Sequence, residues 1–249
     1  MLPISIRVVH LSKHHRVLPN FHLRRLATNH PLSISTTTRN ENRTPTYTFR
    51  TMSTAATPTD STLATQSVQN FCDVLSSKQP TPGGGASAAV GAAIGAGTAA
   101  MSGAYTQRKK DEESGAAEAA RTMISKMNIS SLLSMADDDV KAYQSLQSTW
   151  KKDSGLTLEE VKEIEANALK VPTVLFEACH ERIVAVQEFL PKCNPNITSD
   201  AKVGIHQLAG AARSAYQTIL VNSPPEEEKE RLMKLLREIQ EIENGLLGL

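Results

Sequence analysis

The sequence predicts an all-α protein, folded as a bundle of about five to six helices. Nowhere does it alternate β-branched or aromatic residues with polar ones between turn residues, as strands do. Leu and Ile recur at helical spacing instead, most clearly in the closing segment "EEEKERLMKLLREIQEIENGLL". Gly and Pro interrupt the pattern only sparsely. The predicted helices cover about residues 62–78, 84–107, 111–151, 157–190, 197–221 and 226–246.

Several helix ends are marked by local signals. Asp111 and Glu112 suit the start of the third predicted helix, because acids stabilise the positive end of the helix dipole. Thr157 and Glu160 form a capping box for the fourth. Pro172 falls inside that helix and is expected to kink or divide it. Pro224 and Pro225 end the fifth, and the last helix is typical of a packing or dimer helix.

The N-terminal segment differs from the rest of the chain and predicts a separate unit. Residues 1–59 contain eight Arg and Lys and a single acid, and they are rich in Ser and Thr. This composition is typical of an organellar transit peptide. We therefore expect residues 1–60 to be a disordered mitochondrial targeting leader, and residues 61–249 to be the folded domain. If translation starts at Met52 instead, the protein is expected to be cytoplasmic.

Charge and composition exclude several functions for the folded part. Residues 60–249 hold 19 basic and 25 acidic side chains, a net charge of −6, which disfavours nucleic-acid binding. The chain has one Trp and few aromatic residues for stacking on bases. Its three cysteines show no CxxC spacing, so neither a disulfide framework nor a metal site is expected.

The stretch "PTPGGGASAAVGAAIGAGTAAMSGAYTQRKK", residues 80–110, holds the main functional signal. It has too few large apolar residues for a membrane span, and it lacks the lysine of a phosphate-binding loop. Gly83, Gly84 and Gly85 precede a helix whose free N–H groups form a receptor for an anion or a carbonyl. Small residues then recur every four positions, which allows close approach of a flat ligand or of another helix. These are Ser87, Gly91, Gly95, Ala99 and Gly103.

This stretch resembles the signature that opens the cyclodeaminase/cyclohydrolase family, which includes the C-terminal domain of formiminotransferase-cyclodeaminase and bacterial methenyltetrahydrofolate cyclohydrolases. Two later segments are similar to family motifs in the same order, "LLSMADDDVKAYQSL" at 132–146 and "NPNITSDAKVGIHQLAGAARSAYQTILVN" at 194–222. The sequence departs from the family where Thr218-Ile219 replaces an Asn-Val pair and where Asp138 replaces a glutamate. The resemblance covers about residues 62–223.

The resemblance implies an all-helical homodimer that acts on a folate. One linked reaction cyclises 5-formimino-tetrahydrofolate to the 5,10-methenyl form with loss of ammonia. The other reversibly hydrolyses the methenyl compound to 10-formyl-tetrahydrofolate. Both pass through a tetrahedral carbon between N5 and N10, and both need proton transfer but no metal or other cofactor. The sequence does not choose between them.

Asp139 is the strongest candidate for the proton transfer. It shares a helical face with Met135, Ala142 and Leu146, so we expect it to be half-buried with a raised pKa. Asp137 is the second catalytic candidate, although its spacing from Lys141 also fits a surface ion pair. The alternative for the whole acidic triplet is a solvated turn of helix.

The remaining candidates would bind or orient the substrate. Lys109 is a catalytic candidate and Lys110 a substrate-binding one, for the glutamate tail of folate or a developing charge, whereas Arg108 suits the helix dipole. The resemblance implies that Asn196 or Asp200 faces the ligand, although helix capping explains one polar residue in that segment. Gly83, Gly84 and Gly85 complete the predicted substrate site.

A second class of function stays open on the sequence alone. A non-catalytic helical scaffold, or a partner subunit of a folate enzyme, would keep the fold without the chemistry. The replacement at Thr218-Ile219 favours this alternative, and the retained glycine turn, lysines and acidic triplet oppose it.

Overall fold

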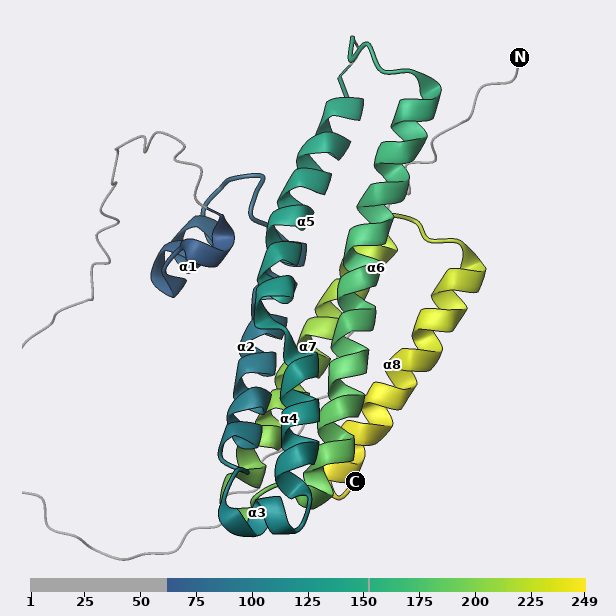
Figure 1. Cartoon of the computed structure of the whole chain (residues 1–249). Helices are drawn as coiled ribbons and strands as arrows, with labels where there is room; N and C mark the ends of the chain where they lie inside the picture. The colour runs from purple at the N-terminus through teal and green to yellow at the C-terminus, as the bar shows by residue number, and fades with distance from the viewer. Residues whose placement is uncertain (1–61, 152) are drawn as a thin grey trace, which may run out of the picture. The chain divides into compact units, whose positions relative to one another are not determined.

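The computed structural model describes residues 62–151 and 153–249, and every element of regular secondary structure in these residues is a helix. The predicted all-α fold is therefore confirmed (Figure 1). Five long helices form the bundle: α2 (Gly84–Ala104), α5 (Ile129–Thr149), α6 (Leu158–Phe189), α7 (Thr198–Val221) and α8 (Glu226–Leu247). Shorter helices are α1 (Val68–Leu75), α3 (Lys109–Glu113) and α4 (Ala116–Met127), with 3₁₀ turns at Leu63–Thr65, Leu190–Lys192 and Pro195–Ile197. The predicted leader, residues 1–60, lies outside the described residues.

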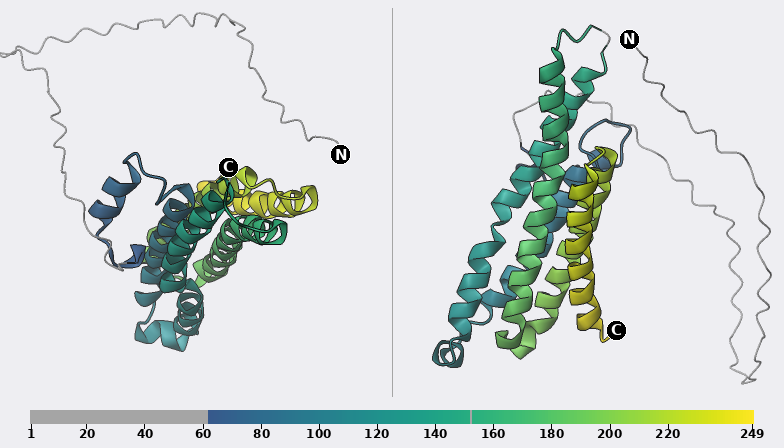
Figure 2. Two further views of the ribbon diagram at one scale, coloured as in Figure 1. Left: turned by 90° about the horizontal axis from the view of Figure 1, so that it is seen from above. Right: turned by 90° about the vertical axis from the view of Figure 1, so that its right-hand side faces the viewer.

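Helix α2 lies between α5 and α7 and is largely buried (Figures 1 and 2). Alanine and glycine allow this position, because their small side chains let neighbouring backbones come close. A Cβ atom at Gly204 would lie 2.9 Å from the backbone nitrogen of Ala99. One at Gly95 would lie 3.0 Å from the backbone nitrogen of Leu208. The small residues of α2 are thus partly explained by helix packing, and α2 and α7 run antiparallel.

The predicted helix over 111–151 is wrong, because the chain forms three helices there. Gly115 and Asn128 adopt left-handed conformations with φ of 75° and 32°, and each breaks the helical path. Asn128 also caps α5 by accepting a hydrogen bond from the Ser131 N–H group at 3.2 Å. Similarly, the helix predicted over 62–78 is shortened to α1 and one 3₁₀ turn.

Pro172 does not divide α6, which continues from Leu158 to Phe189. The predicted capping box of Thr157 and Glu160 is confirmed at its start. Buried Arg182 of α6 donates to the Met127 carbonyl at 2.9 Å, which ties the end of α4 to the bundle. Glu243 of α8 contacts both His206 and Arg213 of α7, so α8 is held by polar contacts as well as by its apolar face.

Candidate active site

The first turn of α2 meets α5 at Asp139. The Ala86 N–H group donates a hydrogen bond of 2.9 Å to Asp139 Oδ2. Gly85 makes this contact possible, because a Cβ atom there would lie 2.5 Å from Asp139 Cγ, inside van der Waals contact. The glycine therefore brings the carboxyl group against the start of a buried helix.

The surroundings of Asp139 favour its protonated form. The side chain is half-buried, as the sequence predicts, and this burial raises its pKa, while the hydrogen bond from Ala86 opposes the shift. The result is a carboxyl group that keeps its proton to higher pH than an exposed aspartate. Such a group can both donate and accept a proton at higher pH than an exposed aspartate can.

Gly83 and Gly84 differ from Gly85, because the surrounding protein does not require their small size. A Cβ atom at either position would meet no atom within 4 Å. Gly83 is the N-cap of α2 and makes no side-chain cap, so the amides of Gly84 and Gly85 stay available beside Asp139 while that of Ala86 bonds it. Sequence reasoning did not single out the Ala86 amide, since a backbone donor leaves no side-chain signal.

Asp137 has a structural contact of its own. It accepts a hydrogen bond of 2.8 Å from the Leu63 N–H group, which fixes the 3₁₀ turn before α1 against α5. Lys141 pairs with Asp138 at 3.8 Å, so the predicted pair between Asp137 and Lys141 is wrong. A catalytic role for Asp137 stays a prediction.

Lys109 and Lys110 lie beyond the opposite end of α2. The 21 residues of this helix span about 30 Å, and both lysines are exposed at the start of α3. Arg108 forms a bidentate pair with buried Asp111 and holds the pKa of that carboxyl group at about 2. Its predicted role at the α2 dipole stays a prediction. One chain therefore does not bring its lysines to its own Asp139.

Asn196 and Asp200 lie at the same distant end, where α7 begins. Neither caps α7, whose N-cap residue Ile197 has no side-chain bond, so the capping explanation is wrong. The buried neighbour Asn194 has the structural role instead. Its side-chain amide donates to the Tyr105 carbonyl at 3.0 Å, which joins the end of α2 to the start of α7. The Asn-Pro step in "NPNITSD" was the available signal.

The structure offers little support for other kinds of site. Residues 62–151 and 153–249 contain no group of three His, Cys, Asp or Glu side chains arranged to hold a metal ion. No helix in these ranges is both long and apolar enough to span a bilayer. The histidines of α6 and α7 pair with α8, His180 with Glu238 at 3.0 Å and His206 with Glu243 at 2.9 Å.

Comparison with known proteins gives this site a family context. Residues 67–241 match the formiminotransferase-cyclodeaminase family over most of the folded chain. The chain belongs to this family. A methenyltetrahydrofolate cyclohydrolase of Methylorubrum extorquens is 26% identical over 190 residues, which cover 74% of this chain and 89% of the relative.

A solved structure shares the fold. It is the formiminotetrahydrofolate cyclodeaminase of Thermotoga maritima, with a TM-score of 0.58 and 21% sequence identity. The match covers 73% of this chain and 92% of the other.

Proposed function

We propose that the protein is a folate one-carbon enzyme that acts at the N5/N10 bridge of tetrahydrofolate. Its activity is that of a formiminotetrahydrofolate cyclodeaminase or of a methenyltetrahydrofolate cyclohydrolase. The contact of Asp139 with the first turn of α2 carries the proposal, because it places a carboxyl group of raised pKa beside free backbone donors. The two relatives, named for these two reactions, support it.

Asp139 would move the proton in either reaction. In cyclisation, N10 attacks the formimino carbon, N10 loses a proton, and the departing nitrogen gains protons to leave as ammonia. In hydrolysis, water adds to the methenyl carbon and loses a proton. The bond from that carbon to N5 then breaks as N5 gains a proton and the added hydroxyl loses its own to become the formyl oxygen, so one proton is released overall. One carboxyl group that alternates between protonated and ionised forms serves both halves of each reaction.

Neither reaction calls for a redox step, and proton transfer balances both. We therefore propose that the enzyme works without a metal or an organic cofactor, with the tetrahydrofolate derivative as its substrate. The amides at Gly84 and Gly85 would hydrogen-bond the substrate at the positive end of α2.

The test is the Asp139→Asn variant, which keeps the shape of the side chain and its acceptor for the Ala86 amide. Turnover should fall by about 10²–10⁴-fold with little change in affinity, since general acid-base groups contribute on that order. Exposed Asp138→Asn is the matched control. The absorbance of the methenyl compound reports both reactions, appearing during cyclisation and disappearing during hydrolysis. Unchanged turnover in Asp139→Asn would reject this assignment.

We also propose that the enzyme is a homodimer formed through the outer face of α2 and α7. No charged residue occurs on α2, and its exposed face carries Ile94, Met101 and, just after the helix, Tyr105. Exposed Val203 and Gly210 continue this face on α7. A two-fold axis through it would set two α2 helices antiparallel. Each Lys109 would then approach the partner's glycine turn, which it cannot reach within its own chain.

Mixing two variants tests this arrangement. Asp139→Asn and Lys109→Ala chains should each be nearly inactive alone. Unfolded together and refolded, random pairing should restore about a quarter of wild-type activity, because each mixed dimer has one intact site. A monomer in sedimentation analysis, or no recovery on mixing, would contradict the shared site.

We further propose that residues 1–60, outside the described part of the chain, direct the protein to mitochondria. Their composition, with eight basic residues and one acid before residue 60, supports this. Translation from Met52 would remove most of the segment and leave the enzyme in the cytoplasm.

A further inference from the structure

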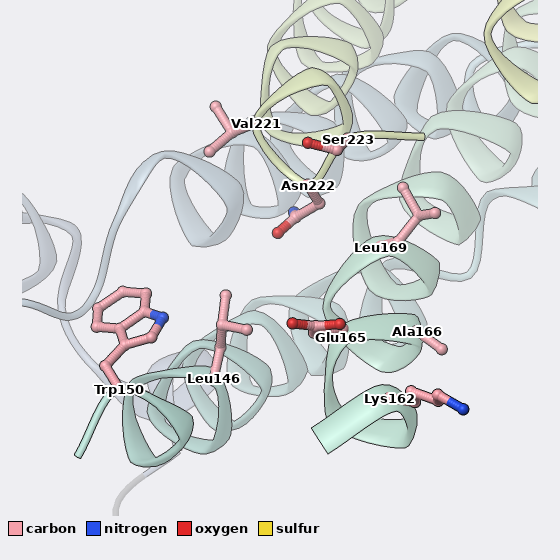
Figure 3. A pocket seen from close by; sticks show the side chains of 9 residues that line it. All are labelled: Leu146, Trp150, Lys162, Glu165, Ala166, Leu169, Val221, Asn222 and Ser223. Carbon is pink, nitrogen blue, oxygen red and sulfur yellow. The ribbon is translucent and has the colours of Figure 1, made fainter. Parts of the chain in front are cut away.

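A cavity of about 600 Å³ lies between the end of α5, the start of α6 and the end of α7 (Figure 3). Its size is in the range of small-molecule sites. The cavity lies close to the candidate active site when positions are compared along α5 and along α7. Leu146, which lines it, follows Asp139 by two turns of α5, about 10 Å. In the antiparallel register of α2 and α7, Gly84 is level with about Ile219, three residues before Asn222 in the lining.

Asn222 presents an acceptor to this cavity. Its side-chain nitrogen donates to the carbonyls of Ala168 and Thr218, at 3.0 Å each. Both amide hydrogens are thereby used, and the side chain is held in one orientation. Its oxygen points into the cavity (Figure 3).

Glu165 adds a second acceptor. Its carboxylate points into the cavity toward Leu146 (Figure 3). Lys162 also belongs to the lining, but its ammonium group points away from the cavity and pairs with Glu159 at 3.5 Å. The polar lining therefore suits N–H donors and disfavours a carboxylate or a phosphate.

Trp150 supplies the complementary donor. Its indole packs edge-on against Tyr143, with ring centroids 6.1 Å apart, and its ring nitrogen is turned toward the cavity (Figure 3). Leu146 and Leu169 contribute apolar surface on which a flat ring can lie. The cavity thus combines one N–H donor, two acceptors and apolar walls.

We propose that this cavity binds the amino-oxo-pyrimidine edge of a pterin ring. That edge carries one carbonyl and two N–H donor positions, which match the indole donor and the acceptors of Asn222 and Glu165. The inference rests on the proposed folate activity, and it places the ring of the substrate two turns beyond Asp139. Guanine has the same edge, so the test must separate the two ligands.

Trp150 is the only tryptophan of the chain, so intrinsic fluorescence reports this cavity directly. The full-length protein is titrated with 5-formyl-tetrahydrofolate, a stable folate, and free N-acetyltryptophanamide corrects for absorbance. Equilibrium dialysis measures binding independently. We expect a saturable change in Trp150 emission with the same midpoint as dialysis, and a change with guanosine only at much higher concentration.

Two variants then test the contacts. By dialysis, Glu165→Gln should weaken binding about tenfold, because a charge-assisted hydrogen bond becomes a neutral one. Trp150→Phe should weaken it several-fold by removing the donor. Exposed Glu163→Gln, two residues from Glu165 and absent from the cavity lining, is the matched control and should bind as wild type does.

The outcomes separate the two proposals. If Glu165→Gln and Trp150→Phe bind folate in dialysis as wild type does, and folate leaves the wild-type emission unchanged, the assignment of the cavity to the pterin ring is overturned. The proposed function then still stands. Guanosine that binds as tightly as the folate, with the same dependence on Glu165, overturns the pterin assignment. If the wild-type protein shows neither folate binding nor turnover, the proposed function is overturned, and the cavity assignment with it.

Discussion

Replacing Gly85 with alanine should displace the carboxyl group on which the proposed chemistry depends. The added Cβ would lie 2.5 Å from Asp139 Cγ and 2.9 Å from Oδ2. Helix α2 is buried between α5 and α7 and cannot move away freely, so the Asp139 side chain must rotate. The hydrogen bond from the Ala86 amide would then be lost.

The stability change can be estimated from these contacts. Overpacking of this kind reduces the free energy of unfolding by about 1–3 kcal/mol. Loss of the hydrogen bond removes about 0.5–1.5 kcal/mol more. The helix preference of alanine over glycine returns up to about 1 kcal/mol. The net expectation is a loss of about 0.5–4.5 kcal/mol.

Urea denaturation followed by circular dichroism measures this loss, with Gly84→Ala as the matched stability control. A Cβ atom at Gly84 meets nothing within 4 Å, so that variant should be as stable as wild type or more so. Turnover of Gly85→Ala should fall by about 10²-fold, the usual effect of displacing a catalytic group by about 1 Å. If Gly85→Ala matches Gly84→Ala in stability and keeps full turnover, the close contact with Asp139 is not essential.

Three further outcomes are expected. Because burial raises the folded pKa of Asp139, its contribution to stability is complete below the ordinary aspartate pKa and is lost as the pH rises through the raised value. Urea denaturation across this range should therefore show wild type losing stability relative to Asp139→Asn, and a constant difference would refute the pKa shift. Gly204→Ala should lower the free energy of unfolding by about 1–3 kcal/mol, because its Cβ would lie 2.9 Å from the Ala99 backbone nitrogen, whereas Gly245→Ala, with open space around it, should not. A reporter fused to the full chain should enter mitochondria, and one fused to the chain from Met52 should stay cytosolic. A cytosolic signal from both would refute the prediction that residues 1–60 are a targeting leader.

Much of the site near Asp139 could be predicted from spacing alone. An acid on an apolar helical face is half-buried in any bundle that buries that face, so its raised pKa followed from the sequence. The packing role of the small residues on α2 was likewise open to prediction, because four-residue spacing places them along one side of a helix. What this spacing did not reveal was the partner of each glycine. Gly85 meets a carboxylate, Gly95 meets α7, and Gly84 meets nothing.

The sequence by itself determined the helical fold, the net negative charge of residues 60–249 and the burial of Asp139, because these depend on composition and local periodicity. Tertiary structure decided which candidates share a site. Lys109 follows the glycine turn closely in sequence, yet a rigid helix of 21 residues holds them about 30 Å apart within one chain. Conversely, Trp150, Glu165 and Asn222 are distant in sequence and line one cavity, because antiparallel helices bring their ends together. Local signals report turns and faces, whereas proximity between helices depends on packing that no single segment encodes.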